Sequence, residues 1–413
     1  MLKIVTGRIN SGKTTYIRSV IKDKLASGAE KVYLIVPEQF SFESERSMLT
    51  LLGEKEALKV EVCSFSRLAQ NVLGDIHGVR CLDEAGRVAL MSTALEETSD
   101  KLTVYGRFSR SIGVVSEMLK ISDEFKKCAV TPVMLEETSH KLPNGMLRNK
   151  LNDLSLVISA FDALVAQRFS DSRDDLTLLA DKLLEDRFFS GITVVIDGFK
   201  GFTKQEFDVI SRIIAQSDDT YITLCLDEIF AGEYDISPFA SVRETARTLM
   251  NIAKKNSVAV SQVRVPEYSG RYVSHCLEAL ESQLYSVSPI PYDCKCSDVS
   301  IFSATTAYEE CNYVAVEVKR LLREEGYRCR DIAIISRSED EYSKSMRAAL
   351  KRHGVPVFED KRRPLASQPP VVMARAAIEI AARGYSTDAL MRLLKTQLTD
   401  LTVEEISELE NYV

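Results

Sequence analysis

The chain opens with Leu2-Lys3-Ile4-Val5-Thr6, a short β-prone run, and continues as Gly7-Arg8-Ile9-Asn10-Ser11-Gly12-Lys13-Thr14. The second part matches G-x-x-x-x-G-K-[ST], the pattern of a phosphate-binding loop. From residue 15 onward, apolar residues recur at helical spacing, as expected for the helix that follows such a loop. A strand, a glycine-rich loop and a helix in this order predict a nucleoside-triphosphate site within an α/β domain.

Residue types in this loop suit the binding of phosphate. The glycines allow backbone dihedrals that bring successive N–H groups around an anion, and the helix that follows offers its N-terminal N–H groups. We expect residues 7–14 to bind ATP, with the Lys13 ammonium on the β- and γ-phosphates and the Thr14 hydroxyl on Mg²⁺.

Length and composition favour a globular protein of more than one domain. The chain has 413 residues, of which 45% are hydrophobic, and this is enough for two or three packed cores. No apolar run approaches the length of a membrane span, so we expect no membrane partner. The net charge of −7 excludes a histone-like binder but leaves room for a local DNA channel.

Cysteine and histidine usage gives no sign of a metal cluster. Nine cysteines lack periodic spacing, and we expect free thiols because a phosphate-binding loop works in the reducing cytosol. Cys294 and Cys296 are a close pair, but no second pair or histidine cluster accompanies them. Four scattered histidines support neither a zinc site nor a catalytic triad.

Strand-like and helical patterns alternate along the chain, which indicates a parallel sheet. Buried-strand patterns follow the loop at residues 31–36, 60–64, 191–197 and 221–226. We predict a RecA-like phosphate-binding domain from residues 1–82 and 188–290, interrupted by a helical insertion over 83–187. Further strand patterns at 299–302, 332–335 and 355–358 predict the start of a second RecA-like α/β domain over 297–413.

This order of segments is the plan of superfamily 1 helicases, and short motifs make the likeness closer. The motifs are Val36-Pro37-Glu38-Gln39, Ser64-Phe65-Ser66-Arg67, Asp197-Gly198-Phe199 with Phe202-Thr203, Glu309-Glu310, Asp331-Ile332-Ala333-Ile334-Ile335-Ser336-Arg337 and Asp360-Lys361-Arg362-Arg363-Pro364-Leu365. In this order they resemble the B subunit of the bacterial AddAB-type ATP-dependent helicase–nuclease, over essentially the whole chain.

The resemblance implies a role in DNA repair. Such a protein pairs with an A-type helicase–nuclease subunit and acts on broken double-stranded DNA for homologous recombination, in the cytoplasm at the nucleoid. Its helicase-like part holds single-stranded DNA and has weak or no motor activity. The family's nuclease domain and iron–sulfur cluster belong to a C-terminal part, so we expect neither here and assign no cysteine as a ligand.

The fourth strand lacks the usual catalytic pair. Superfamily ATPases end this strand with Asp-Glu, in which the aspartate serves Mg²⁺ and the glutamate activates water. Here Asp197 is followed by Gly198, which predicts ATP binding with slow or absent turnover. Glu206 and the Asp227-Glu228 pair are alternative bases, although a solvated helix position is the simpler interpretation of Glu206. Arg337 either reaches the γ-phosphate or lies at a surface strand end.

Contacts with single-stranded DNA are predicted near the carboxyl ends of the strands, where open α/β sheets place ligands. The candidates are Phe40, Phe42, Ser64, Phe65 and Arg67, together with the cationic run Lys361-Arg362-Arg363. For any single one of these aromatic residues a place in the core is the simpler interpretation, and the cationic run could be a solvated loop.

Two other functions fit the loop. An autonomous P-loop kinase could use residues 83–187 as a lid, but the second α/β unit argues against it. An active superfamily 1 helicase is disfavoured by Gly198. Stimulation of ATPase activity by single-stranded DNA separates the three: slight for a DNA-holding protein, indifferent for a kinase and large for a motor.

Overall fold

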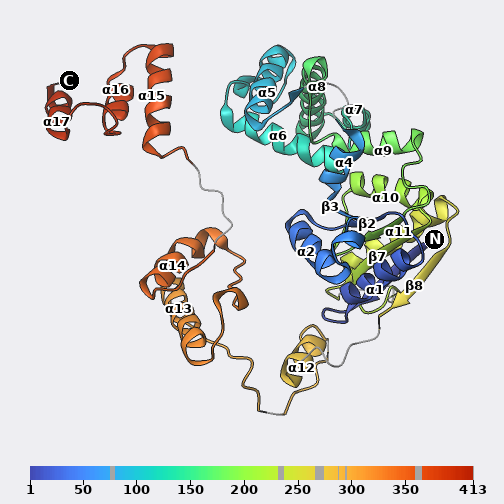
Figure 1. Ribbon diagram of the computed structural model, residues 1–413. Helices are drawn as coiled ribbons and strands as arrows, with labels where there is room; N and C mark the ends of the chain where they lie inside the picture. Colours follow the sequence, from blue (N-terminus) through green and yellow to red (C-terminus); the bar gives the residue numbers. More distant parts are fainter. Residues whose placement is uncertain are drawn as a thin grey trace. The chain divides into compact units, whose positions relative to one another are not determined.

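The computed structural model describes residues 1–74, 80–230, 237–265, 274–286, 288–293, 295–358 and 365–412 (Figure 1). The chain forms two compact units, Met1–Val299 and Ser300–Val413. The finer division into a sheet domain, a helical insertion and a second α/β domain stays a prediction.

A six-stranded sheet forms the centre of the first unit, with the strand order β3-β2-β6-β7-β1-β8 and every neighbouring pair parallel. The strands are β1 (Leu2–Gly7), β2 (Val32–Ile35), β3 (Val60–Cys63), β6 (Thr193–Ile196), β7 (Asp219–Cys225) and β8 (Val260–Arg264). The predicted α/β fold with a parallel sheet is confirmed. β8 was not predicted.

Helices cover both faces of this sheet, which explains its nearly continuous apolar strands. Because side chains alternate along a strand, Ile4 and Val5 of β1 belong to different cores. On the Val5 face the sheet packs against α1 (Lys13–Ala26) and α2 (Ser41–Leu52). The Ile4 face packs against α4 (Phe65–Leu73), α9 (Asp175–Glu185), α10 (Lys204–Gln216) and α11 (Ala240–Lys255).

Four of the helices that lie between β3 and β6 in the sequence have a core of their own. They are α5 (Glu84–Thr98), α6 (Ile112–Lys127), α7 (Pro132–Lys141) and α8 (Met146–Arg168). Met91, Met118 and Phe161 are fully or almost fully buried between them. The chain enters and leaves this bundle through two short paired strands, β4 (Arg80–Cys81) and β5 (Phe169–Ser170).

The second unit is helical in the part that the structure describes. Its helices are α13 (Ala307–Glu324), α14 (Glu339–Arg352), α15 (Pro369–Arg383), α16 (Thr387–Leu394) and α17 (Val403–Tyr412). Within that described part, the strands predicted at 299–302, 332–335 and 355–358 are not formed. These segments have strand-like sequences, but a strand requires a hydrogen-bonded neighbour, and Ile335 and Phe358 stay 93% and 90% exposed.

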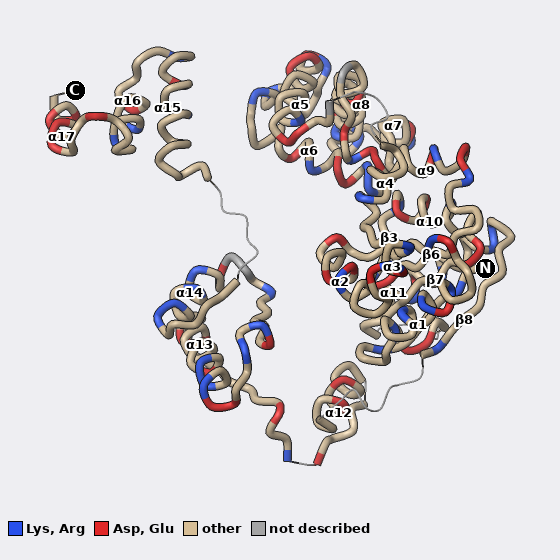
Figure 2. The backbone as a smooth tube through the Cα atoms, in the orientation of Figure 1, with Lys and Arg blue, Asp and Glu red and all other residues tan. Residues whose placement is uncertain are grey.

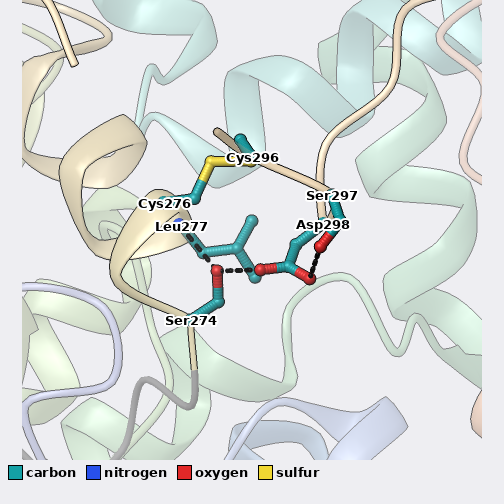
Figure 3. Close-up of a disulfide and its surroundings, with 6 residues drawn as sticks. All are labelled: Ser274, Cys276, Leu277, Cys296, Ser297 and Asp298. Atoms are coloured by element: carbon teal, nitrogen blue, oxygen red, sulfur yellow. Dashed lines mark hydrogen bonds between the residues drawn. A yellow bond between two sulfur atoms is a disulfide. The ribbon is translucent and has the colours of Figure 1, made fainter. Parts of the chain in front are cut away.

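A disulfide joins Cys276, at the start of α12 (His275–Gln283), to Cys296, with the two Cα atoms 6.0 Å apart (Figure 3). The prediction that the cysteines are free thiols is therefore wrong for this pair. A separation of 20 residues carries no local signal, because the two thiols meet only through the folding of the intervening chain. Cys294 lies outside the described residues.

Acidic and basic residues are intermixed along the chain (Figure 2). None of the helices in the described ranges combines the length and the apolar character that crossing a bilayer demands.

At the amino-terminal edge of the sheet, Asp219 on β7 accepts hydrogen bonds from Lys24 at 2.6 Å and Lys3 at 3.1 Å. Burial raises the pKa of the Asp219 carboxyl, but these two lysines outweigh burial and hold that pKa below its ordinary value.

We expect the Asp219 carboxylate to contribute stability above its ordinary pKa of about 3.9 and to lose it as the pH falls through its lower folded pKa. Urea unfolding from pH 6 to pH 3 should therefore show a smaller acid-dependent loss of free energy in Asp219→Asn than in the wild type. The control is Asp218→Asn, at the exposed neighbouring position. Equal acid dependence in Asp219→Asn and the wild type would contradict this.

Candidate nucleotide-binding site

The predicted phosphate-binding loop connects β1 directly to α1. Gly12 has φ +92° and Asn10 has φ +62°, and both values lie in the left-handed region. The Ser11 N–H donates to the Arg8 carbonyl at 3.2 Å, which closes a turn, and the Tyr16 N–H donates to the Gly12 carbonyl at 2.9 Å, which starts the helix. Glycine at position 12 thus permits the sharp change of direction from loop to helix.

Close packing at the base of the loop explains the glycine at position 7. A Cβ atom on Gly7 would lie 2.3 Å from the Ser11 hydroxyl oxygen and 2.9 Å from its Cβ. Ser11 is 3% exposed, and its hydroxyl has no hydrogen-bond partner among the residues that the structure describes. A buried hydroxyl without a partner is unusual, and a phosphate oxygen would supply the missing partner.

The Lys13 ammonium lies over the loop. It donates hydrogen bonds of 2.7 Å to the carbonyl oxygens of both Gly7 and Arg8. Thr14 and Ile9 are exposed at the mouth of the loop. The eight predicted loop residues are therefore brought together around one turn, with a cation and a helix N-terminus on the same side, as anion binding requires.

Arg8 makes contacts that sequence reasoning missed. Its Nε donates to Glu281 Oε1 of α12 at 2.9 Å, and its Nη2 donates to the Glu281 carbonyl at 2.9 Å. Its guanidinium also lies 5.5 Å from the centre of the Phe239 ring. Because 273 residues separate Arg8 from Glu281, no local pattern in the sequence could indicate this pair.

Asp197, the predicted Mg²⁺-associated residue, directly follows β6. β6 and β1 both neighbour β7 in the parallel sheet, so Asp197 lies at the same edge as the phosphate-binding loop. The Thr223 hydroxyl donates to Asp197 Oδ1 at 2.5 Å. Gly198, at the position of the usual base, has φ +86°, and a Cβ there would lie 3.4 Å from Pro37 Cδ. This backbone disfavours a glutamate.

The alternative bases have structural partners. Asp227 Oδ1 accepts from Arg243 Nη2 at 2.5 Å, and the Glu228 carbonyl accepts from Arg243 Nε at 2.7 Å. Glu206 closes a capping box on α10, in which its Oε2 accepts from the Thr203 N–H at 2.7 Å. These contacts favour the structural interpretation of the Asp227 and Glu206 carboxylates. The Glu228 side chain is 68% exposed and lies 3.8 Å from Arg264, so Glu228 stays a candidate base. Arg337 is exposed in the second unit.

The predicted DNA-contact residues divide into surface and core. Phe42 lies at the start of α2 and is 77% exposed. Phe40 lies in the turn before α2 and is 43% exposed. Phe65 is only 4% exposed and packs edge-on against Phe199 at 5.5 Å, so the structure supports the core interpretation of this residue.

Ser64 and Arg67 lie at the start of α4. The Ser64 hydroxyl accepts from the Arg67 N–H at 3.2 Å and so caps the helix, which assigns it a structural contact. Arg67 Nη1 donates to Glu45 at 2.9 Å, with more than half of the arginine side chain exposed. Lys361, Arg362 and Arg363 lie outside the described residues.

A family model and individual relatives place this chain in the same protein family. Residues 4–281 match the family model described as "ADDB, N-terminal". The B subunits of the ATP-dependent helicase/deoxyribonucleases of Clostridium kluyveri and Acetivibrio thermocellus align with all of the chain, and each is 32% identical to it. The chain spans 36% and 37% of the lengths of these two relatives.

Proposed function

Because this chain belongs to the AddB N-terminal family, we propose that it is the ATP-binding, helicase-like part of the B subunit of a helicase–nuclease. The observation that carries the proposal is the loop between β1 and α1, where left-handed Gly12, the buried Ser11 hydroxyl and the Lys13 ammonium converge. Its partners would be an A-type subunit, single-stranded DNA and broken double-stranded DNA, in the repair of double-strand breaks by homologous recombination.

ATP binding would change the contacts of Lys13. The ammonium leaves the carbonyl oxygens of Gly7 and Arg8 for the β- and γ-phosphates, and the loop N–H groups bind the same anion. Mg²⁺, when bound, neutralises phosphate charge. Thr14 would ligate it through its hydroxyl, and Asp197 would hold a water of its coordination shell.

We propose that hydrolysis by this site is slow. Losing a general base typically costs a factor of 10²–10⁴, or roughly 3–5 kcal/mol of barrier. Gly198 offers no base, and Glu206 already accepts a backbone hydrogen bond within its own helix cap. The site then acts as a nucleotide-dependent holder of DNA, not as a motor.

DNA would be held by stacking on exposed aromatic side chains. Phe40 and Phe42 follow β2, on the edge of the sheet where the strands end. Stacking of one base on an aromatic side chain is worth about 1–3 kcal/mol and tolerates any sequence. Arg67 adds a cation near the start of α4, a position suited to contact with the phosphate backbone.

Binding of a fluorescent oligothymidine tests this proposal. We expect Phe42→Ala to weaken binding by roughly tenfold, in line with the loss of one stacked base. The matched control is Phe108→Ala, at an exposed phenylalanine of the helical bundle, which should leave binding unchanged. In the same samples, steady-state ATP turnover should stay negligible with and without DNA.

Two results would contradict the proposal. Equal DNA affinity in Phe42→Ala and the wild type would remove the stacking site. Turnover of several per second that depends on single-stranded DNA would identify a motor, and would point to Asp227 and Glu228 as a working pair.

A further inference from the structure

Helix α12 contacts the phosphate-binding loop through one ion pair. Arg8 belongs to the loop, and both of its hydrogen bonds to α12 end on Glu281, one on the carboxylate and one on the carbonyl, each at 2.9 Å. The two side chains are largely buried, with 24% and 23% exposed. A largely buried pair with two hydrogen bonds has a defined geometry, so this contact fixes α12 against the loop.

The same loop residue also contacts Lys13. The Arg8 carbonyl accepts one of the two hydrogen bonds from the Lys13 ammonium, while the Arg8 guanidinium is held by Glu281. A movement of Lys13 toward a phosphate therefore removes a hydrogen bond from the residue that anchors α12. Contacts at α12 and contacts at the phosphate site meet in Arg8.

Covalent and polar links hold α12 in shape. The helix has nine residues, and helices shorter than about 12 residues are marginal by themselves. Cys276 is bonded to Cys296, and the Ser274 hydroxyl donates to Asp298 at 2.5 Å (Figure 3). In addition, the Ile290 N–H donates to the Gln283 side chain at 3.0 Å. These three links tie α12 to the chain that follows it and so help to present Glu281 to Arg8.

We propose that α12 is a latch on the nucleotide-binding loop: the Glu281 carboxylate holds Arg8 and opposes the binding of a nucleoside triphosphate, and the Cys276–Cys296 bond keeps the latch closed. The inference rests on the proposed function of the loop. Glu281 neutralises one of the loop's cations with a carboxylate, and this negative charge beside the site disfavours a triphosphate. By linkage, a bound triphosphate weakens the docking of α12 by the same factor.

Reduction of the disulfide opens the latch. Two equivalents of a small-molecule thiol exchange with the Cys276–Cys296 bond, which leaves two protein thiols and one small-molecule disulfide. Oxidation by such a small-molecule disulfide reverses the step and releases two small thiols. Without the bond, the short helix loses its main restraint, and Glu281 is no longer presented in one position.

The test is the dissociation constant of MgATP, measured by calorimetry on the full chain in its oxidised and reduced forms. We expect Glu281→Gln to bind MgATP roughly threefold to tenfold more tightly than the oxidised wild type, because it removes one negative charge beside the loop. Glu278→Gln is the matched control, since Glu278 lies on the same helix and faces His275 at 3.4 Å. It should bind like the wild type.

Reduction should tighten binding in the wild type and in Glu278→Gln, but not further in Glu281→Gln. Cys276→Ser, which cannot form the bond, should bind as the reduced wild type does. Hydrogen exchange supplies a second readout: addition of MgATP should speed the exchange of amides 275–283 in the oxidised wild type.

The outcomes separate the latch from the function on which it rests. Lys13-dependent MgATP binding that is equal in the wild type and Glu281→Gln, and unaffected by reduction, would overturn the latch and leave the proposed function intact. Failure of every form to bind MgATP would overturn the proposed function, and the latch with it. Weaker binding by Glu281→Gln would show that Glu281 supports the nucleotide instead of opposing it, and would also overturn the latch.

Discussion

Lys13→Ala is expected to weaken MgATP binding by about 100-fold, a loss of roughly 2.7 kcal/mol. The Lys13 ammonium is directed across the loop, with hydrogen bonds of 2.7 Å to the carbonyl oxygens of Gly7 and Arg8. In a complex those donors go to phosphate oxygens, and charge-assisted hydrogen bonds contribute about twice as much as neutral ones. Calorimetric titration of the variant with MgATP measures the loss.

A second lysine of the same helix provides the control. Lys22 is exposed in the later part of α1, away from the phosphate-binding sequence, so Lys22→Ala should bind MgATP like the wild type. Thermal unfolding of both variants should match the wild type, since neither side chain belongs to the core. Wild-type affinity in Lys13→Ala would remove the basis for a phosphate-binding loop.

Local sequence patterns predicted the features of the sheet that depend on neighbouring residues. The glycines of the loop, the buried strands and the order of strand and helix are all set within short stretches, where dihedral preference and side-chain period act directly. The sequence alone also showed that glycine stands at position 198, where these ATPases usually have a glutamate. The structure adds a conformational reason, because the φ of +86° at this position disfavours a glutamate.

Features that depend on distant parts of the chain were beyond such reasoning. The Arg8–Glu281 pair and the Cys276–Cys296 bond join segments whose meeting depends on the tertiary fold. Phe65 illustrates the same limit, since its sequence context allowed both core and surface, and its burial against Phe199 in the folded chain decides between them. The strand-like segment 332–335 has the apolar pattern of a strand without a pairing partner in the described part of the second unit.

A buried network of charges joins the helical bundle to the segment that returns to the sheet. Arg87 of α5 is 3% exposed and hydrogen-bonds Asp123 of α6 through both terminal nitrogens. Its Nε lies 3.5 Å from Asp171, whose side chain is fully buried just after β5. Lys126 of α6 also contacts Asp171, at 3.2 Å. Two cations thus share one buried carboxylate.

Arg87→Ala is expected to lower the free energy of unfolding by about 3–5 kcal/mol, because breaking a buried ion pair leaves a charge that the interior cannot solvate. In this variant Asp123 still pairs with Arg173 at 3.3 Å, and Asp171 still pairs with Lys126. The loss arises because these remaining cations only partly neutralise the two carboxylates, and because removal of the arginine side chain leaves a cavity at a buried position. Urea unfolding measures the loss, and faster hydrogen exchange in α5 and α6 would locate it. Arg110→Ala, at an exposed pair with Glu96, should change stability by less than about 0.5 kcal/mol.

A double variant separates the two sources of this loss. If the loss comes from the unpaired charge, Asp123→Ala should cost less in the Arg87→Ala background than in the wild type, because its partner is already absent. If it comes from lost packing alone, the two losses should add, because each side chain then leaves its own cavity. We expect a coupling energy of at least about 1 kcal/mol, since the two side chains share two hydrogen bonds in a site from which water is largely excluded. Additive losses would show that the bundle is held by its apolar core, with Arg87 and Asp123 only filling space between α5 and α6.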